Sequence, residues 1–128
     1  MTTREPPLPR KVWIGTYEYE LHLVEPTDTV LDDADGITLS EDGRKAVFIS
    51  NSLGIRRRLE IVFHELTHAI NWVNDVGQSD DDMVAMEEEE LAEKYGLAWS
   101  AFLLDNPRFQ RWLTYTLNKI RKERTDGA

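Results

Sequence analysis

The hydrophobic positions of the chain change their period at about residue 52. Before that point they alternate with polar residues or form short apolar runs, which is typical of β-strands. The alternation over residues 11–25 predicts one strand, or a hairpin that turns at Gly15 and Thr16. Two further β-prone runs, residues 37–39 and 45–50, flank an Asp-Gly pair and predict a second hairpin.

From residue 55 onward, apolar residues recur every three or four positions, which is the period of an α-helix. The pattern predicts one helix from Ile55 to about Asp75, a second that starts at Ser79 and runs through Leu104, and a third that begins at Pro107. Because the strands precede the helices instead of alternating with them, the predicted fold class is α+β. We expect a small antiparallel sheet, made of a strand plus a hairpin, followed by three helices.

The length of 128 residues is that of one domain, and 41% hydrophobic residues can supply a core. We expect residues 1–10, which contain three prolines, to form a flexible arm. Residues 11–128 are then a single domain, with its core in residues 11–106 and a C-terminal helix at residues 107–124.

Charge and composition narrow the classes of function. The formal net charge of −9 argues against a nucleic-acid partner, because neutralising phosphates needs a basic face. Cysteine is absent, which excludes disulfides, thiol catalysis and cysteine-ligated zinc. The sequence has neither an apolar run long enough to span a membrane nor an apolar N-terminal leader. We therefore expect a cytoplasmic protein that binds no nucleic acid and no membrane.

The first predicted helix contains an H-E-x-x-H sequence, formed by His64, Glu65 and His68. The two histidines are four residues apart, so they share one helix face and can bind one Zn²⁺ from the same side. Glu65 occupies the next position around the helix, from which a carboxylate can reach a zinc-bound water and act as general base. The motif predicts a zinc-dependent peptidase with His64 and His68 as metal ligands and Glu65 as the catalytic residue. The alternative is that both histidines are polar residues at the edge of the core.

A catalytic zinc site needs a third protein ligand and an open fourth position. If the first two helices pack antiparallel about their loop, residues from Glu89 to Glu93 lie beside the histidines. Glu89, Glu90 and Glu93 are therefore the candidates for the third ligand. The one other histidine, His22, lies in a strand and is expected to be structural. The side chains that could help to stabilise an oxyanion are His22, Tyr95, Tyr115 and the run Arg56-Arg57-Arg58.

Residues Lys11 to Asn106 resemble the small zincin domains, of the gluzincin kind, that occur in phage and bacterial proteins and are related to the ImmA/IrrE metallopeptidases. The resemblance rests on the strand Ala46–Ser50, on the helix with the H-E-x-x-H sequence, and on Glu93 with the apolar stretch that Pro107 closes. It implies Zn²⁺ as the cofactor, Glu93 as the third ligand, and a peptidase of narrow or regulatory specificity. In zincins a strand beside the metal helix pairs with the extended peptide substrate, and Ala46–Ser50 is the candidate edge strand.

Two other functions compete with the peptidase. One is a zinc-binding protein that cleaves nothing, although such a protein has no need of a carboxylate at Glu65. The other is an interaction module whose third helix docks a partner. Residues 75–93 carry nine acids and residues 108–124 carry six bases, and we expect these two segments to pair within the chain.

Overall fold

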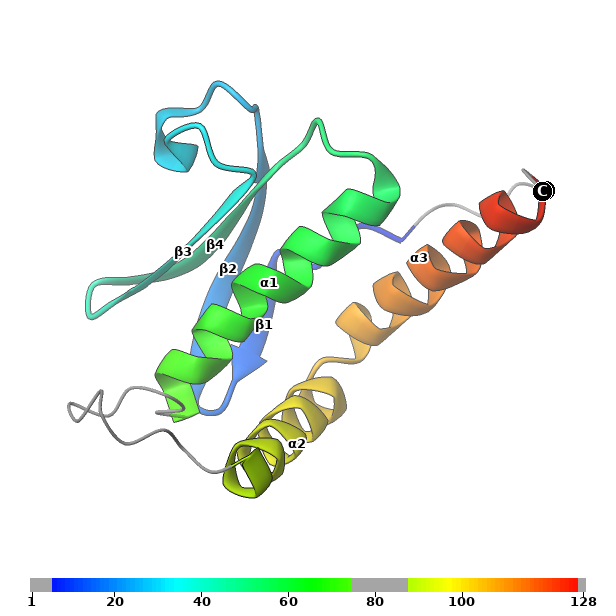
Figure 1. Cartoon of the computed structure of the whole chain (residues 1–128). Coiled ribbons are helices and arrows are strands. Elements are labelled where there is room, and N and C mark those ends of the chain that lie inside the picture. The colour runs from blue at the N-terminus through cyan, green and yellow to red at the C-terminus, as the bar shows by residue number, and fades with distance from the viewer. Residues whose placement is uncertain (1–5, 75–87, 127–128) are drawn as a thin grey trace.

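The structure is a computed structural model, and it describes residues 6–74 and 88–126. Strands precede helices, as the α+β prediction requires (Figure 1). The elements are β1 (Lys11–Ile14), β2 (Tyr17–Val24), the short 3₁₀ helix η1 (Thr29–Leu31), β3 (Gly36–Glu41), β4 (Arg44–Ser50), α1 (Ile55–Asn74), α2 (Glu88–Asp105) and α3 (Pro107–Asp126). The expected start of the second helix, at Ser79, lies outside the described residues.

Residues 11–24 form the hairpin, not the single strand, of the two alternatives that the alternation allows. β1 and β2 pair antiparallel, with Ile14 opposite Tyr17 across a two-residue turn. Gly15 opens this turn with a φ of 61°, in the left-handed region that glycine adopts without strain. A Cβ at Gly15 would also lie 3.2 Å from Cγ1 of Val73, so the turn sits close against the end of α1.

The sheet is mixed, and the prediction of an antiparallel sheet is wrong in one pairing. The strand order is β1-β2-β4-β3, in which β4 pairs antiparallel with β3 but parallel with β2. Residues 46–50 of β4 are all buried, as expected for a central strand. β3 is half-buried and includes the polar residues Thr38 and Ser40, as expected for an edge strand. Ala46–Ser50 is therefore an interior strand, and the edge strand beside α1 is β3.

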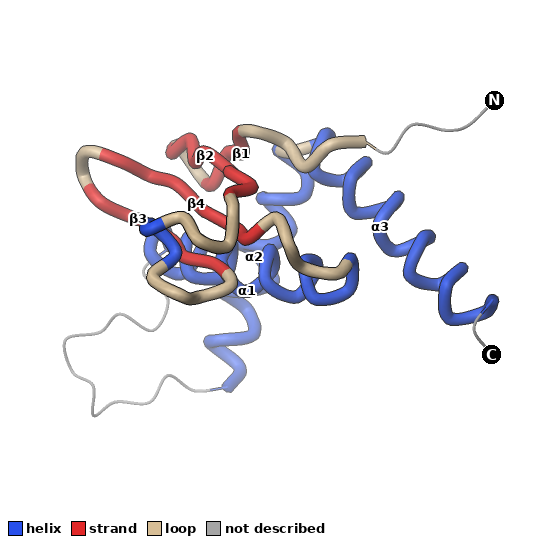
Figure 2. Tube along the Cα trace, turned by 90° about the horizontal axis from the view of Figure 1, so that it is seen from above, coloured by secondary structure: helices blue, strands red, loops and turns tan. Residues whose placement is uncertain are grey.

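The main core lies between the sheet and the helices. α1 lies along one face of the sheet and α2 and α3 run alongside it (Figure 1). Figure 2 shows the same elements from above. The largest fully buried side chains of this core are Trp112, Tyr19, Phe102, Phe109, Ile14, Ile49, Leu66 and Ile70. A smaller cluster of Leu31, Ala46 and Phe48 covers the opposite face of the sheet under η1. Among the described residues, no helix is both long and apolar enough to cross a membrane.

Asn106 fixes the corner between α2 and α3 to the sheet. Its side-chain Oδ1 accepts a hydrogen bond from the Trp13 amide at 2.8 Å, and its Nδ2 donates to the Trp13 carbonyl at 2.8 Å. Nδ2 also donates to the Phe102 carbonyl at 2.7 Å. The Asn106 amide thus pairs with Trp13 at the free edge of β1 in the way a residue of a neighbouring strand would.

Part of the expected N-terminal arm packs on the domain. Leu8 contacts the main core, Pro9 is buried, and the Leu21 amide donates a 2.7 Å hydrogen bond to the Arg10 carbonyl. Residues 1–5 lie outside the described residues. The same holds for residues 75–87, which carry most of the acids that we expected to pair with α3.

Candidate metal centre

Two histidines of α1 point their Nε2 atoms at one another beside β3. The Nε2 atoms of His64 and His68 are 3.2 Å apart, and both side chains are exposed. Two nitrogens that each lie about 2.0–2.1 Å from a tetrahedral Zn²⁺ are about 3.3–3.4 Å apart. The two nitrogens can therefore occupy two of the four coordination positions of one zinc ion with almost no rearrangement, as the spacing of four residues predicts.

Glu65 lies next to this pair but is buried, with only 5% of its surface exposed. The Thr38 hydroxyl can donate to its Oε1, at 2.8 Å, or to its backbone carbonyl, at 2.9 Å. The second carboxylate oxygen, Oε2, is 3.8 Å from Nε2 of His64. One oxygen is thus oriented by β3, while the other faces the histidine pair.

Gly36 allows β3 to approach α1 closely enough for this contact. A Cβ at Gly36 would lie 2.7 Å from Cγ2 of Ile61 and 2.9 Å from Cγ of Glu65, so a methyl group there would force one of these side chains to shift. Neither Gly36 nor Thr38 was among the residues predicted from the sequence. The signal available was a glycine directly before a β-prone run, with a hydroxyl two residues later on the same face of the strand.

The histidine pair opens into a cleft of 470 Å³ between α1 and β3. Its lining residues are His64, Glu65, His68 and Trp72 of α1 with Gly36, Ile37, Thr38 and Ser40 of β3. Trp72 follows His68 by one helical turn and closes the cleft with an aromatic wall. Its ring lies 5.6 Å from that of Tyr17, and the Lys45 ammonium lies 5.0 Å from the Trp72 ring and 4.8 Å from the Tyr17 ring.

The structure does not bring Glu93 to the histidine pair. α2 packs on another side of α1, where the rings of Phe63 and Trp99 stack with centroids 5.1 Å apart. Glu93 precedes Trp99 by six residues, which places the two side chains about 120° apart around the helix axis. Glu93 is exposed. Among the described residues, no group of three or more His, Asp or Glu could hold a metal.

The other candidate third ligands are no better placed. Glu90 is exposed and lies 3.9 Å from the ammonium of Lys94, on its own helix. The side chain of Glu89 is outside what the structure describes. Glu93 as third ligand therefore stays a prediction that rests on the family resemblance alone.

His22 lies on the sheet face opposite α1, away from the cleft. Its ring stacks on Phe48, with centroids 5.0 Å apart, and its Nε2 is 3.0 Å from Oε1 of Glu20. The hydrogen bond from His22 is the largest cause of the lowered pKa of Glu20, and the nearby charge of Arg44 adds to it. His22 therefore has partners that account for it without the metal site.

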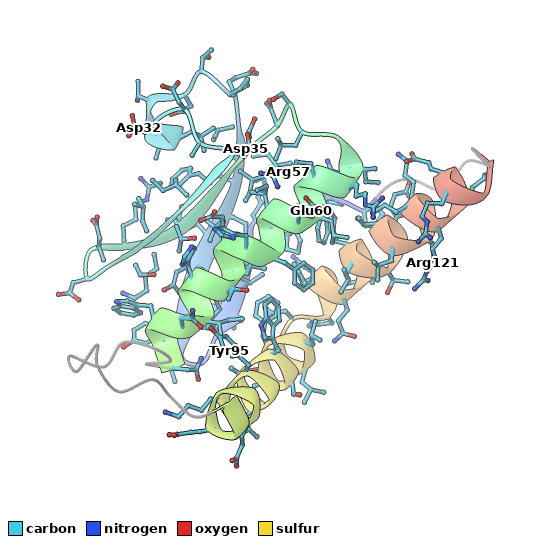
Figure 3. All side chains as sticks on the ribbon, in the orientation of Figure 1. Asp32, Asp35, Arg57, Glu60, Tyr95 and Arg121 are labelled. Atoms are coloured by element: carbon cyan, nitrogen blue, oxygen red, sulfur yellow. The ribbon has the colours of Figure 1, made fainter. Side chains whose placement is uncertain are left out.

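The remaining oxyanion candidates also lie away from the lining of the cleft. Tyr95 and Tyr115 are half-buried on α2 and α3. Arg57 forms ion pairs at 3.2 Å with Asp35 and with Glu60 (Figure 3). The bonds to Glu60 and then to Asp35 raise the pKa of Arg57. Arg57 therefore ties the start of α1 to the segment before β3.

Comparisons of the chain with protein-family models, with curated proteins and with solved structures find no match. The geometry of the site therefore has to support any assignment of function.

Proposed function

We propose that the protein is a zinc-dependent peptidase of narrow specificity whose catalytic base is Glu65. The observation that carries this proposal is the pairing of two metal-ligand nitrogens 3.2 Å apart with a buried carboxylate whose Oε2 lies 3.8 Å from one of them. Burying a carboxylate is costly unless it is hydrogen-bonded, so stability alone does not explain a buried carboxylate beside two exposed histidines. The arrangement suits hydrolysis.

His64 and His68 would hold the metal. Glu93, the third ligand that the family resemblance implies, does not join them in a three-ligand group in the structure. When bound, Zn²⁺ supplies the Lewis acidity that acidifies a water molecule and polarises the carbonyl of the peptide bond. The chain's own contribution is Glu65, whose Oε2 takes the proton from the attacking water and delivers it to the leaving amine. The bond from Thr38 to Oε1 keeps the carboxylate turned towards the histidine pair.

The edge of β3 offers a template for an extended peptide. β3 pairs with β4 on one side only and forms one wall of the cleft, opposite the two histidines. A peptide that adds to this edge as a further strand would pass the histidine pair and Glu65 along its length. This assigns to β3 the role that the sequence suggested for Ala46–Ser50.

The test is cleavage of a peptide mixture by the zinc-loaded protein, with products identified by mass spectrometry. We expect cleavage by the native protein and a loss of about a hundredfold or more in the Glu65→Gln variant, because general-base catalysis contributes at least that much. The variant should retain its zinc, since Glu65 is the base and not a ligand. Equal cleavage by both proteins would contradict the assignment of the base.

A second candidate is a zinc-binding protein without catalysis. The observation that favours it is that the described residues supply two metal ligands and no third. It predicts that the native protein and the Glu65→Gln variant bind zinc equally and that neither cleaves any peptide. The same experiment therefore distinguishes the two candidates.

A further inference from the structure

A groove of 690 Å³ lies on another part of the molecule, between the N-terminal segment and the first turns of α3. Figure 2 shows this segment running beside α3 on its way to β1. The residues that line the groove are Pro6, Pro7, Leu8, Pro9, Arg10, Lys11, Arg108 and Arg111. The volume lies within the range of known ligand pockets, and none of these residues belongs to the histidine cleft.

The groove is positively charged within a protein of net charge −9. Its lining has four cations and no acid. Lys11 forms an ion pair with Glu18 at 3.4 Å, whereas the ion pairs between described residues include none for Arg10, Arg108 or Arg111. Three arginines therefore line one groove, and no ion pair with a carboxylate of the described residues balances them.

The stability of α3 does not explain the two arginines at its start. The N-terminal end of a helix dipole is positive, so it disfavours cations in the first turn, where Arg108 stands. Arg111 follows one turn later on the same face. The C-terminal Arg124, in contrast, lies where the dipole favours a cation. The placement of Arg108 is a cost to the helix that an anionic ligand would offset.

We propose that this groove binds an acidic peptide segment of a partner protein. Guanidinium groups bind carboxylates through two parallel hydrogen bonds, and Arg108 and Arg111 present two such groups one helical turn apart. The prolines and Leu8 supply the apolar part of the lining, which can accommodate an apolar side chain between the carboxylates. The ligand is therefore a segment in which acidic residues flank apolar ones. This inference does not depend on the peptidase activity.

The overall charge favours a short acidic peptide over a nucleic acid. A nucleic acid extends beyond the groove and meets the field of a chain that has 24 acids and 15 Lys and Arg residues. Binding of a long polyanion needs a basic face that neutralises several phosphates in a row. A peptide with a few carboxylates can place all of its charge inside the groove.

The test is fluorescence anisotropy of a dye-labelled peptide of alternating Glu and Leu, titrated with the full-length protein at low salt. We expect saturable binding that weakens about tenfold or more in the Arg108→Glu/Arg111→Glu variant. A Lys119→Glu/Lys122→Glu variant is the matched control, because it changes the net charge equally at exposed positions of the same helix. This control should bind within about twofold of the native protein, since its charges lie outside the groove.

An Arg108→Gln/Arg111→Gln variant removes the charge without reversing it and keeps the test valid if the reversal unfolds the protein, which circular dichroism would show. We expect it to weaken binding about tenfold as well. Three results would each overturn the proposal: no saturable binding of the acidic peptide, an equal loss in the control variant, or tighter binding of a labelled oligothymidylate than of the peptide.

Discussion

The two long sides of α1 differ in composition: one is polar and lines a cleft, and the other is aromatic and packs against helices. The side that faces β3 carries His64, Glu65 and His68 beside a cleft, with polar contacts from Thr38. The side that faces α2 and α3 carries Phe63, which belongs to a chain of aromatic rings. These rings are Phe63, Trp99, Phe102, Phe109 and Trp112, with neighbouring centroids 5.0 to 6.0 Å apart.

Because of this difference, the aromatic contacts that stabilise α1 come from α2 and α3, whereas the contacts that shape the candidate site come from β3. Aromatic packing on the α2 side stabilises the position of α1, and it places no described metal ligand next to the histidines. Close approach of β3 on the other side sets the orientation of Glu65 and the shape of the cleft. Substitutions on the α2 side should therefore lower stability, whereas substitutions on the β3 side should also change the zinc site and catalysis.

The largest effect on stability is expected from the aromatic side. Phe109 is fully buried and contacts the rings of Phe63, Phe102 and Trp112. Phe109→Ala should lower the free energy of unfolding by about 3–5 kcal/mol, because it removes these contacts and leaves a cavity. Urea denaturation measures the loss. Zinc affinity of the folded variant should stay within about threefold of the native value. A larger fall would show that the aromatic packing and the zinc site are not independent.

A smaller loss of stability is expected at the contact between β3 and α1. Gly36→Ala places a methyl group 2.7 Å from Ile61 and 2.9 Å from Glu65, and the strain should cost about 1–3 kcal/mol. Gly43→Ala is the matched control, because nothing lies within 4 Å of a Cβ there. Thermal unfolding of both variants checks the prediction, and an equal shift in melting temperature would contradict the close approach.

Thr38→Val tests the orientation of Glu65 with little change of volume. It removes the hydroxyl that bonds to Oε1, and we expect a loss of about 1 kcal/mol in stability. If Glu65 is the base, kcat should also fall about tenfold with KM nearly unchanged, because the carboxylate loses its fixed position. Ser40→Ala is a control that alters another hydroxyl of the same strand. Equal kcat values for the Thr38→Val variant and the native protein would show that Thr38 does not position the base.

The smallest effect is expected on the sheet face opposite α1, at Glu20. Its lowered pKa means that folding favours the ionised form, so Glu20 contributes stability above its unfolded-state pKa. That contribution is lost as the pH falls through the lowered folded-state pKa. His22→Ala should raise the pKa of Glu20 more than Arg44→Ala does, because the hydrogen bond from His22 is the larger cause. Carboxyl-carbon NMR titrations measure both, and the reverse order would contradict the assignment.

Local patterns predicted the elements of this fold well. The helical period located α1 and the start of α3 at Pro107, and the Asp-Gly pair located the β3–β4 hairpin. The sequence could not order the strands, because the insertion of β4 between β2 and β3 depends on pairing between distant segments. The continuous apolar run of residues 46–49 was the available signal for an interior strand.

The residues of the candidate site also fall into a group that local spacing predicted and a group that depends on the tertiary fold. His64, Glu65 and His68 lie within one helical turn, so their spacing alone places them on neighbouring positions. Thr38 and Gly36 lie more than twenty residues away in sequence, and their contacts with α1 exist only through the tertiary fold. The third ligand depends on how α2 packs against α1, which no local pattern encodes, and among the described residues no third ligand joins the pair.

A zinc site on the side of α1 that faces β3 can be checked by measuring bound metal. Purified native protein, Glu65→Gln and His68→Ala would be equilibrated with zinc, desalted and measured by inductively coupled plasma mass spectrometry. We expect about one zinc per chain in the native protein and in Glu65→Gln, and much less in His68→Ala. No zinc in the native protein, or an unchanged content in His68→Ala, would contradict this expectation.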